Sequence, residues 1–352
     1  MKRLLLIICP CLALTASLSS CSEDFKVDAP YKHITLVYGL LNADSTRNYI
    51  RIQKAFLDES KSAVDMSQIP DSNYYPAQDL SVHLKEINDN GSLLFDETLT
   101  RVNLAAEGYP KYTGAFFKDS SFAYKSSRKL TSAYNYRLVI KNTATGQTDS
   151  AETRLVDGIT IDNINAIAFS NTQGQSSFSP RYGTGVNGRT FEGIIRFHYV
   201  DKNTATNVQT DRYYDYSFAT DGNTTRDGAG HLMYITSDRL KALNANFYPA
   251  LASGIGTAPA GIERYMDSCD LFVYGGSEDF FSYMQVNNLQ GGITSDQVKP
   301  IYTNIKGADA LGLFASRSFK VLRNIPLEPG TLTQLMNNGQ TRPLNIKGLS
   351  DH

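Results

Sequence analysis

The stretch HITLVYGLL (residues 33–41) indicates the fold class of this 352-residue chain. Ile34, Leu36, Tyr38 and Leu40 alternate with their neighbours, so they fall on one face of an extended strand. A period of two is typical of a half-buried β-strand. We therefore expect the folded part of the chain to begin with a strand.

The same period recurs in the following residues and predicts a series of strands. It is found in NYIRIQKAFL (48–57), DLSVHLKEI (79–87), NYRLVIKN (135–142) and TDSAETRLV (148–156). The turn at Asn90-Gly91 predicts a hairpin, because Asn-Gly accepts the positive φ that tight turns require. Strands separated by such turns favour a sandwich. We predict a mostly β protein with an immunoglobulin-like β-sandwich over residues 33–157.

A second domain, β-rich and with two short helices, is predicted over residues 158–352. FEGIIRFHYV (191–200) and RYYDYSFAT (212–220) alternate as strands do, and GLFASRSFKVL (312–322) and the tail after Pro326 are also strand-like. One helix is expected near 237–248, with Ser237 as its N-cap and Pro249 at its end. The other is expected near 277–288, capped by Ser277.

The first twenty residues predict a secretory signal. A basic start, Met1-Lys2-Arg3, precedes an apolar run over 4–18, which is too short for a membrane span of about 20 apolar residues. The run ends in Leu18-Ser19-Ser20-Cys21, which resembles the bacterial lipobox. We predict that residues 1–20 are removed and that Cys21 carries a covalent lipid as the membrane anchor. The alternative is a soluble secreted protein in which this cysteine occurs by chance.

Acidic residues follow the predicted lipidation site directly. Ser22-Glu23-Asp24-Phe25 would not help to hold anionic lipid, since basic residues are needed for that. The tetrapeptide resembles the lipoprotein export signal of Bacteroidota. We therefore expect residues 21–32 to form an acidic tether and the protein to face the cell exterior from the outer membrane.

Charge and cysteine content restrict the partners and the covalent links. Removal of residues 1–20 takes Lys2 and Arg3 with it and moves the formal charge from −1 to −3. No basic stripe occurs, so nucleic acid is not an expected partner. Cys269 is the one cysteine left beyond the anchor, so no intrachain disulfide is expected. It lies in a strand-like apolar run, and we expect a small buried hydrophobe.

Motifs for catalysis or metal binding are weak in this sequence. The histidines lack metal-ligand spacing, and neither a nucleophile elbow nor a phosphate-binding loop occurs. We expect no catalytic residues and no cofactor besides the lipid. Two short segments, Asp44-Ser45-Thr46 and Asp149-Ser150-Ala151, resemble Bacteroidota O-glycosylation acceptors, and both are expected in turns.

Two weaker binding candidates remain. Tyr74 and Tyr75 lie in a long polar loop and would serve as an exposed binding platform, or else would pack that loop onto the sandwich. Asp221, Asn223 and Asp227 stand at alternate positions as in a calcium loop. They lack the glycine at the sixth position and the distant glutamate, so a polar turn is the default and calcium the alternative.

A family resemblance emerges near the C-terminus. The lipobox and two β domains are followed by EDFFSYMQVNNL (278–289) and YTNIKGADALGLFASRS (302–318). This order resembles a family of Bacteroidota outer-membrane lipoproteins of unknown function, often encoded beside TonB-dependent transporters. The residues that carry the closing pattern are Tyr302, Asn304, Ile305, Gly307, Gly312 and Phe314. The resemblance implies a location and a transporter as partner, and it implies no catalytic residue.

Three functions are therefore under consideration. The first is a non-catalytic accessory or ligand-binding subunit of a TonB-dependent nutrient uptake system. The second is a fimbrial or adhesive lipoprotein, which requires an exchangeable edge strand. The third is a surface hydrolase, which requires two carboxyl groups about 5–10 Å apart in an aromatic-lined cleft.

Overall fold

The structure is a computed structural model that describes most of the chain after the predicted tether. The described residues are 34–55, 62–111, 114, 117, 120–169, 177–222, 224–226, 232–234, 237–288 and 301–350. Cys21 and the tetrapeptide 22–25 lie outside these ranges, as does the rest of the predicted signal and tether. Residues His33–His352 form one compact unit.

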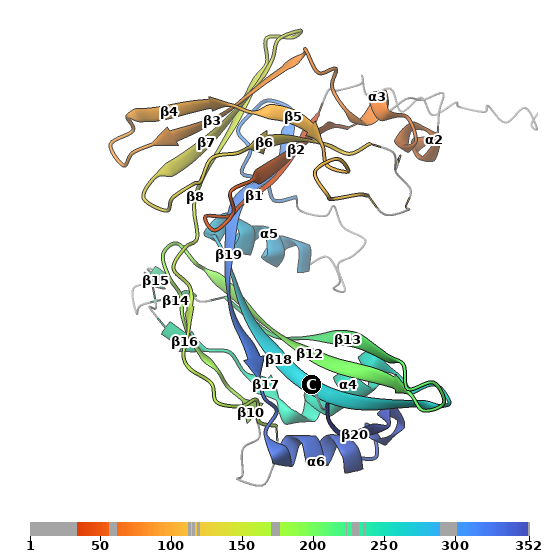
Figure 1. Cartoon of the computed structure of the whole chain (residues 1–352). Helices are drawn as coiled ribbons and strands as arrows, with labels where there is room; N and C mark the ends of the chain where they lie inside the picture. The colour runs from red at the N-terminus through yellow and green to blue at the C-terminus, as the bar shows by residue number, and fades with distance from the viewer. Residues whose placement is uncertain are drawn as a thin grey trace, which may run out of the picture. The chain divides into compact units, whose positions relative to one another are not determined.

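The predicted mostly β fold class is confirmed, and a nine-stranded sheet is the largest feature of the described residues (Figure 1). In order across the sheet, eight of its strands are β13 (Gln209–Gly222), β12 (Thr190–Asn203), β18 (Ile262–Gly276), β19 (Ala310–Ile325), β1 (Thr35–Leu41), β2 (Asn48–Lys54), β6 (Phe122–Ser126) and β5 (Thr100–Asn103). The ninth, β20 (Ile346–Leu349), pairs with β18 off this path.

A second sheet completes a β-sandwich. It consists of β4 (Leu93–Thr98), β3 (Leu80–Ile87), β7 (Asn135–Asn142) and β8 (Thr148–Arg154). Val37 and Ile50 of the large sheet share one buried cluster with Leu84 and Leu138 of this sheet, and each is at most 2% exposed. Burial of such side chains contributes roughly 1.5–3 kcal/mol each, so the shared core accounts for the face-to-face packing.

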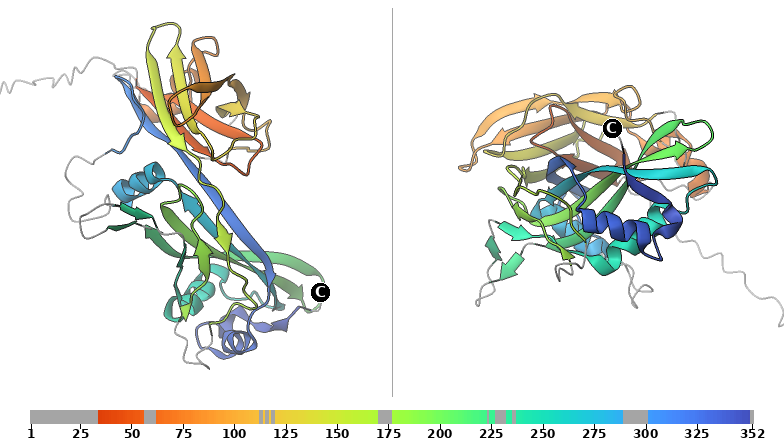
Figure 2. Two further views of the ribbon diagram at one scale, coloured as in Figure 1. Left: turned by 90° about the vertical axis from the view of Figure 1, so that its left-hand side faces the viewer. Right: turned by 60° about the horizontal axis from the view of Figure 1, so that its bottom comes forward.

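The sandwich includes a strand from the far end of the chain. The first part of β19, from Ala310 to Ser316, runs parallel to β1, and the part from Arg317 to Ile325 runs antiparallel to β18. Figures 1 and 2 show β19 as one continuous blue strand. The strands expected over 33–157 form as predicted, and the structure adds a C-terminal strand that lies outside that range.

The buried face of β1 is the opposite of the one that its alternation suggested. Val37 and Leu41 are fully buried, whereas Tyr38 is 43% exposed. The strand is apolar on both faces, so alternation alone did not decide which one meets the core. On the neighbouring β2, Ile50 and Ile52 are buried, as expected.

Three α-helices occur in the described part after residue 157, and one of the two predicted helices is displaced. The helix expected near 277–288 is present as α5 (Glu278–Asn288). The helix expected near 237–248 is wrong in position, because Ser237–Arg239 form β16 and pair with β11 (Arg181–Gly183), and α4 spans Asn244–Ile255. Pro249 lies inside α4 instead of ending it.

The strand-like structure expected in the tail after Pro326 is confirmed only at its end, as β20, and the correction is helix α6 (Pro329–Asn337), which occupies the first part of the tail. Pro329 occupies the first turn, which suits proline, and the Glu328 carboxylate accepts a hydrogen bond from the Thr331 N–H at 2.8 Å. The remaining short elements are α2 (Ala63–Ser67), α3 (Pro70–Asn73), the 3₁₀ helix η3 (Arg342–Leu344), β9 (Thr160–Ile161), β10 (Ser177–Phe178), β14 (Thr224–Arg226), β15 (Leu232–Tyr234) and β17 (Ala242–Leu243).

A second core, rich in aromatic rings, lies beneath β12, β13 and β18. Phe247 of α4 stacks on Phe169 with ring centroids 3.8 Å apart and packs against Phe197 at 5.3 Å. All three rings are buried, as is Cys269 of β18. The chain has no tryptophan, so phenylalanine and tyrosine fill this core.

Candidate functional site

Helix α5 lies beside the three cavities that concern function. Its first turn carries Glu278 and Asp279, where the helix dipole favours negative charge. The preceding Ser277 is held by Ser316 of β19, because the Ser277 N–H donates to the Ser316 carbonyl at 2.9 Å and the Ser316 N–H donates to Ser277 Oγ at 3.2 Å. The helix therefore begins at a fixed point on the large sheet.

A second contact holds the same turn from the other side. The Tyr302 hydroxyl donates to Asp279 Oδ1 at 2.7 Å. Burial, together with this acidic partner, raises the pKa of Tyr302 above its usual range, so the hydroxyl keeps its proton. Tyr302 belongs to the closing pattern of the sequence, and its contact gives that position a structural role.

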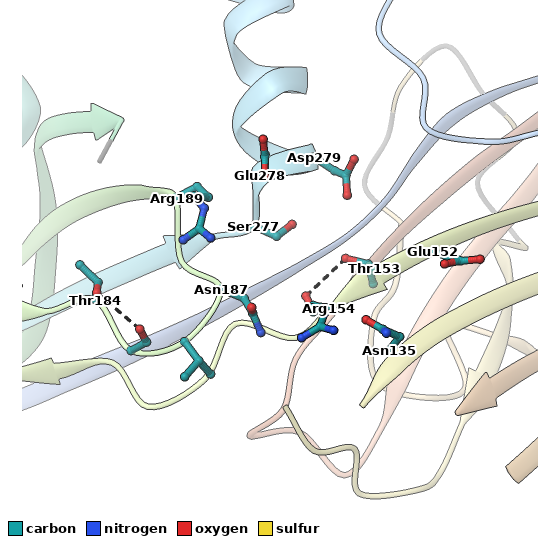
Figure 3. A pocket seen from close by; sticks show the side chains of 12 residues that line it. Asn135, Glu152, Thr153, Arg154, Thr184, Asn187, Arg189, Ser277, Glu278 and Asp279 are labelled. Atoms are coloured by element: carbon teal, nitrogen blue, oxygen red, sulfur yellow. Dashed lines mark hydrogen bonds between the residues drawn. The ribbon is translucent and has the colours of Figure 1, made fainter. Parts of the chain in front are cut away.

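The first cavity is a polar cleft of about 680 Å³ beside the start of α5 (Figure 3). Its lining residues are Asn135, Glu152, Thr153, Arg154, Thr184, Gly185, Val186, Asn187, Arg189, Ser277, Glu278 and Asp279. Glu152 pairs with Arg137 at 2.7 Å, and Arg154 pairs with Asp89. The cleft thus carries both signs of charge, and much of that charge is already paired within the chain.

The second cavity, which we call the tyrosine cavity, holds about 500 Å³. Its lining residues come from β1, β2, β19, α5 and the segment after β5, and they are Tyr38, Gly39, Leu40, Tyr49, Arg51, Leu104, Tyr109, Phe280, Tyr283 and Leu313. Five of these ten residues are aromatic. Arg51 is the one cation among them, and no carboxylate occurs among them.

Strand register brings the central residues of the tyrosine cavity together. Tyr38 stands opposite Arg51 in the antiparallel β1–β2 pair and opposite Leu313 in the parallel β1–β19 pair. Tyr49 precedes Arg51 by two residues, so its side chain leaves β2 on the same face. The outward face of β1, with Tyr38 and Leu40, is therefore a wall of the cavity.

Arg51 is the one charged residue among the described residues that line the tyrosine cavity. Its Nε is shielded from water and has no hydrogen-bond partner, and its Nη2 lies 3.5 Å from Gln53 Oε1. Within the part of the chain that the structure describes, no carboxylate forms an ion pair with Arg51. Burial and the nearby Tyr283 raise the pKa of the Tyr38 hydroxyl, and the Arg51 charge offsets part of that rise.

Neighbouring contacts hold the tyrosines in place. The Tyr49 hydroxyl donates to Glu107 Oε2 at 2.8 Å, and the Lys125 ammonium group donates to the same oxygen at 2.7 Å. Tyr49 and Tyr109 meet edge to face with ring centroids 5.6 Å apart. This part of the wall is thus preorganised, although Tyr109 itself is 60% exposed.

The third cavity, of about 360 Å³, shares Phe280 with the tyrosine cavity. Its lining residues are Thr190, Glu192, Ile194, Tyr274, Gly275, Gly276, Phe280, Met284 and Arg317. A Cβ atom on Gly276 would lie 2.3 Å from Cδ1 of Phe280. A glycine at this position lets the ring lie close to the sheet between the two cavities.

Carboxylates and aromatic rings are separated in the polar cleft and the tyrosine cavity, whereas the third cavity holds Glu192 together with Tyr274 and Phe280. The polar cleft has Glu152, Glu278 and Asp279 but no aromatic side chain among its lining residues. The tyrosine cavity has the rings and lacks the carboxylates. A glycosidase-type hydrolase needs both in one cleft. Among the described lining residues, none of the three cavities combines aromatic rings with a pair of carboxylates.

The exposed platform predicted at Tyr74 and Tyr75 does not form. Both residues are buried, at 6% and 8% exposure. The ring of Tyr74 packs edge to face on Phe122 at 5.2 Å, and the Tyr75 hydroxyl lies 2.9 Å from Thr35 Oγ1. These tyrosines hold the long loop onto the sandwich, because rings of this size gain more from burial than from exposure.

The other predicted sites fall mostly outside the described residues or inside strands. Asn223 and Asp227 are outside the described residues, and Asp221 is described only as backbone near the end of β13. Asp149-Ser150-Ala151 lies in β8, not in a turn, and Ala151 is fully buried. Within the described ranges, no group of three or more His, Cys, Asp or Glu side chains is placed to hold a metal ion.

Sequence reasoning missed the tyrosine cavity, although a signal was present. HITLVYGLL is apolar on both faces, with Val37 and Leu41 on one and Leu36, Tyr38 and Leu40 on the other. A strand covered on one side only does not need the second apolar face. In this protein that second face lines a cavity.

Comparisons with known proteins do not place the chain in a family. No family model matches it, and no curated protein matches it significantly. Among solved structures, the C-terminal globular domain of an oligosaccharyltransferase from Pyrococcus abyssi matches at 9% identity with a TM-score of 0.20. The match covers 86% of this chain and 47% of that one, so the chain spans about half of its length. Across the described ranges, no helix combines the length and apolar character of a membrane span.

Proposed function

We propose that this chain is a surface-exposed, lipid-anchored protein of the outer membrane that binds a small ligand for a TonB-dependent nutrient uptake system, without catalysis. The lipobox at Cys21 and the export-like tetrapeptide after it support the location. The resemblance of residues 278–318 to lipoproteins encoded beside TonB-dependent transporters supports the partner.

The tyrosine cavity is the observation that carries the ligand-binding part. Its volume of about 500 Å³ falls within the range of small-molecule sites, which is roughly 300–1,000 Å³. Such sites are mostly apolar and have a few well-placed polar groups, and Arg51 with the tyrosine hydroxyls fits that description.

The fimbrial alternative requires a strand that can leave its sheet and be replaced. β1 is the first described strand, and it lies between β19 and β2 with Val37 and Leu41 fully buried. Its release would open the large sheet and expose the sandwich core. β1 is therefore not the exchangeable edge strand that the fimbrial function requires, and this supports the accessory function.

A pull-down tests the proposal. The tagged full-length lipoprotein is isolated in mild detergent from intact outer membranes, and co-purifying proteins are identified by mass spectrometry. We expect a TonB-dependent transporter in stoichiometric yield. A Cys21→Ser variant is the control, and it should leave the membrane fraction and lose the partner. Recovery of self-associated chains alone would favour the fimbrial function, and recovery of a lone monomer would overturn the docking.

A further inference from the structure

We propose that the tyrosine cavity binds a small carboxylate attached to a flat ring, with Arg51 as the group that holds the carboxylate. This inference rests on the ligand-binding part of the proposed function and names the class of ligand. It does not depend on which transporter, if any, the protein contacts.

The unmatched charge of Arg51 points to an anion. Arginine stays protonated in proteins, so burial cannot neutralise it as it can a lysine. The Arg51 Nε is shielded from water without a hydrogen-bond partner, and none of the described carboxylates pairs with the guanidinium. Because Nε has no surface open to the cavity, a ligand carboxylate would accept its N–H bonds from the Nη groups of this planar guanidinium and would supply the missing negative charge.

The walls of the cavity point to a ring. Tyr38, Tyr109 and Tyr283 reach it from β1, from the segment after β5 and from α5. Tyr38 and Tyr109 are 43% and 60% exposed, so both are accessible to a ligand. Aromatic side chains pack best on flat rings, in offset-stacked or edge-to-face arrangements.

The small number of polar groups disfavours a neutral sugar. Each buried sugar hydroxyl needs a hydrogen-bond partner, because an unpaired polar group is costly to bury. The polar side chains of the lining are Arg51 and four tyrosines, and the Tyr49 hydroxyl already donates to Glu107. An aromatic acid has a carboxylate as its single polar group, and one guanidinium is enough to hydrogen-bond that carboxylate.

Calorimetry with matched probes tests the ligand class. The full-length lipoprotein in detergent micelles is titrated with benzoate and with benzamide, which has a similar shape but no charge. D-glucuronate and D-glucose form the corresponding pair for an acidic sugar. We expect benzoate to bind about 10- to 100-fold more tightly than benzamide, as a charge-assisted hydrogen-bonded pair should. We also expect it to bind more tightly than D-glucuronate.

Variants separate the contribution of the Arg51 charge to probe binding from the contribution of the aromatic walls. Arg51→Gln should remove the advantage of benzoate over benzamide. Arg51→Lys should keep part of that advantage, because lysine retains the positive charge but lacks the planar guanidinium that can donate two parallel hydrogen bonds. Arg212→Gln is the matched control, since the Arg212 side chain on β13 is 57% exposed and does not line the cavity. Tyr109→Ala should weaken both probes by the same factor. Circular dichroism checks that each variant is folded.

Several outcomes would overturn the inference. Equal affinities for benzoate and benzamide, or unchanged benzoate affinity in folded Arg51→Gln, would remove Arg51 as the anchor. Tighter binding of D-glucuronate than of benzoate would replace the flat ring by an acidic sugar. Failure of all four probes to bind would overturn the ligand class, yet a transporter recovered in the pull-down would still support the proposed function.

Discussion

Ser277 and Ser316 exchange two hydrogen bonds, one from the Ser277 N–H to the Ser316 carbonyl and one from the Ser316 N–H to Ser277 Oγ. The fully buried Ser316 hydroxyl also donates to the Leu41 carbonyl and accepts from the Val156 N–H, each at 2.9 Å. The Ser316 side chain thus joins the end of β1 to the segment after β8, and its backbone holds the start of α5. These segments are up to 275 residues from Ser316 in sequence.

Ser316→Ala should lower the free energy of unfolding by about 1–3 kcal/mol, because the buried Val156 N–H loses its acceptor. Urea denaturation followed by circular dichroism measures the change. The exposed Ser127→Ala is the control and should stay within about 0.5 kcal/mol of the wild type. If Ser316→Ala changed the free energy of unfolding as little as the control does, the Ser316 hydroxyl would contribute nothing to stability.

Gly312→Ala should weaken the parallel pairing of β1 with β19. Gly312 has φ +129°, and a Cβ atom there would lie 1.9 Å from the Val37 carbonyl oxygen. We expect a loss of more than about 1 kcal/mol in the free energy of unfolding, read from the same denaturation curves. Gly339→Ala is the comparison, since a Cβ atom at Gly339 meets nothing within 4 Å. Similar curves for the two variants would contradict the prediction.

Alkaline pH should destabilise the sandwich through Tyr136. Burial, with the nearby Glu86 adding to it, raises the pKa of this fully buried tyrosine from 10.0 to about 12. Because the folded-state pKa is the higher one, the stabilisation is complete below pH 10 and is lost as the pH rises through 12. The Tyr136 hydroxyl accepts from the Thr131 N–H at 2.9 Å and lies 3.2 Å from Glu86 Oε1.

Urea unfolding of the wild type and Tyr136→Phe at several pH values measures this effect. The wild type should be the more stable protein at pH 8, and the difference should shrink between pH 10 and pH 12. Tyr248, whose pKa is also raised to about 12, is present in both proteins and cancels in the comparison. A difference that stays constant over this range would refute the assignment to Tyr136.

Tyr302→Phe should loosen the first turns of α5, because it removes the hydrogen bond to Asp279. We expect faster amide hydrogen exchange in residues 278–288 and a loss of about 1 kcal/mol in the free energy of unfolding. Tyr213→Phe, at an exposed position, provides the control. Since Phe280 and Tyr283 belong to this helix, Tyr302→Phe should also weaken probe binding in the tyrosine cavity. Unchanged exchange over 278–288 would show that other contacts hold the helix.

Local patterns predicted the strands well, because alternation reflects a backbone whose side chains point to opposite faces. The strands at 48–54, 80–87 and 135–142 follow this rule, with one face buried against the sandwich core. The helix at 278–288 was also predictable from its acidic first turn and apolar spacing. The segment 237–239 was misplaced because its hydrogen bonds go to β11, and pairing with a distant strand can override a local capping signal.

The sequence by itself determined the mostly β class and the positions of most strands, and it provides the signal for the expected lipid anchor at Cys21. Only the tertiary structure decided that β19 joins β1, that Tyr38 faces outward, and that Arg51 lies among tyrosines. The physical reason is the range of the interactions. Alternation and turn chemistry act between neighbours in the chain, whereas a cavity is formed by side chains that meet only when distant strands pair.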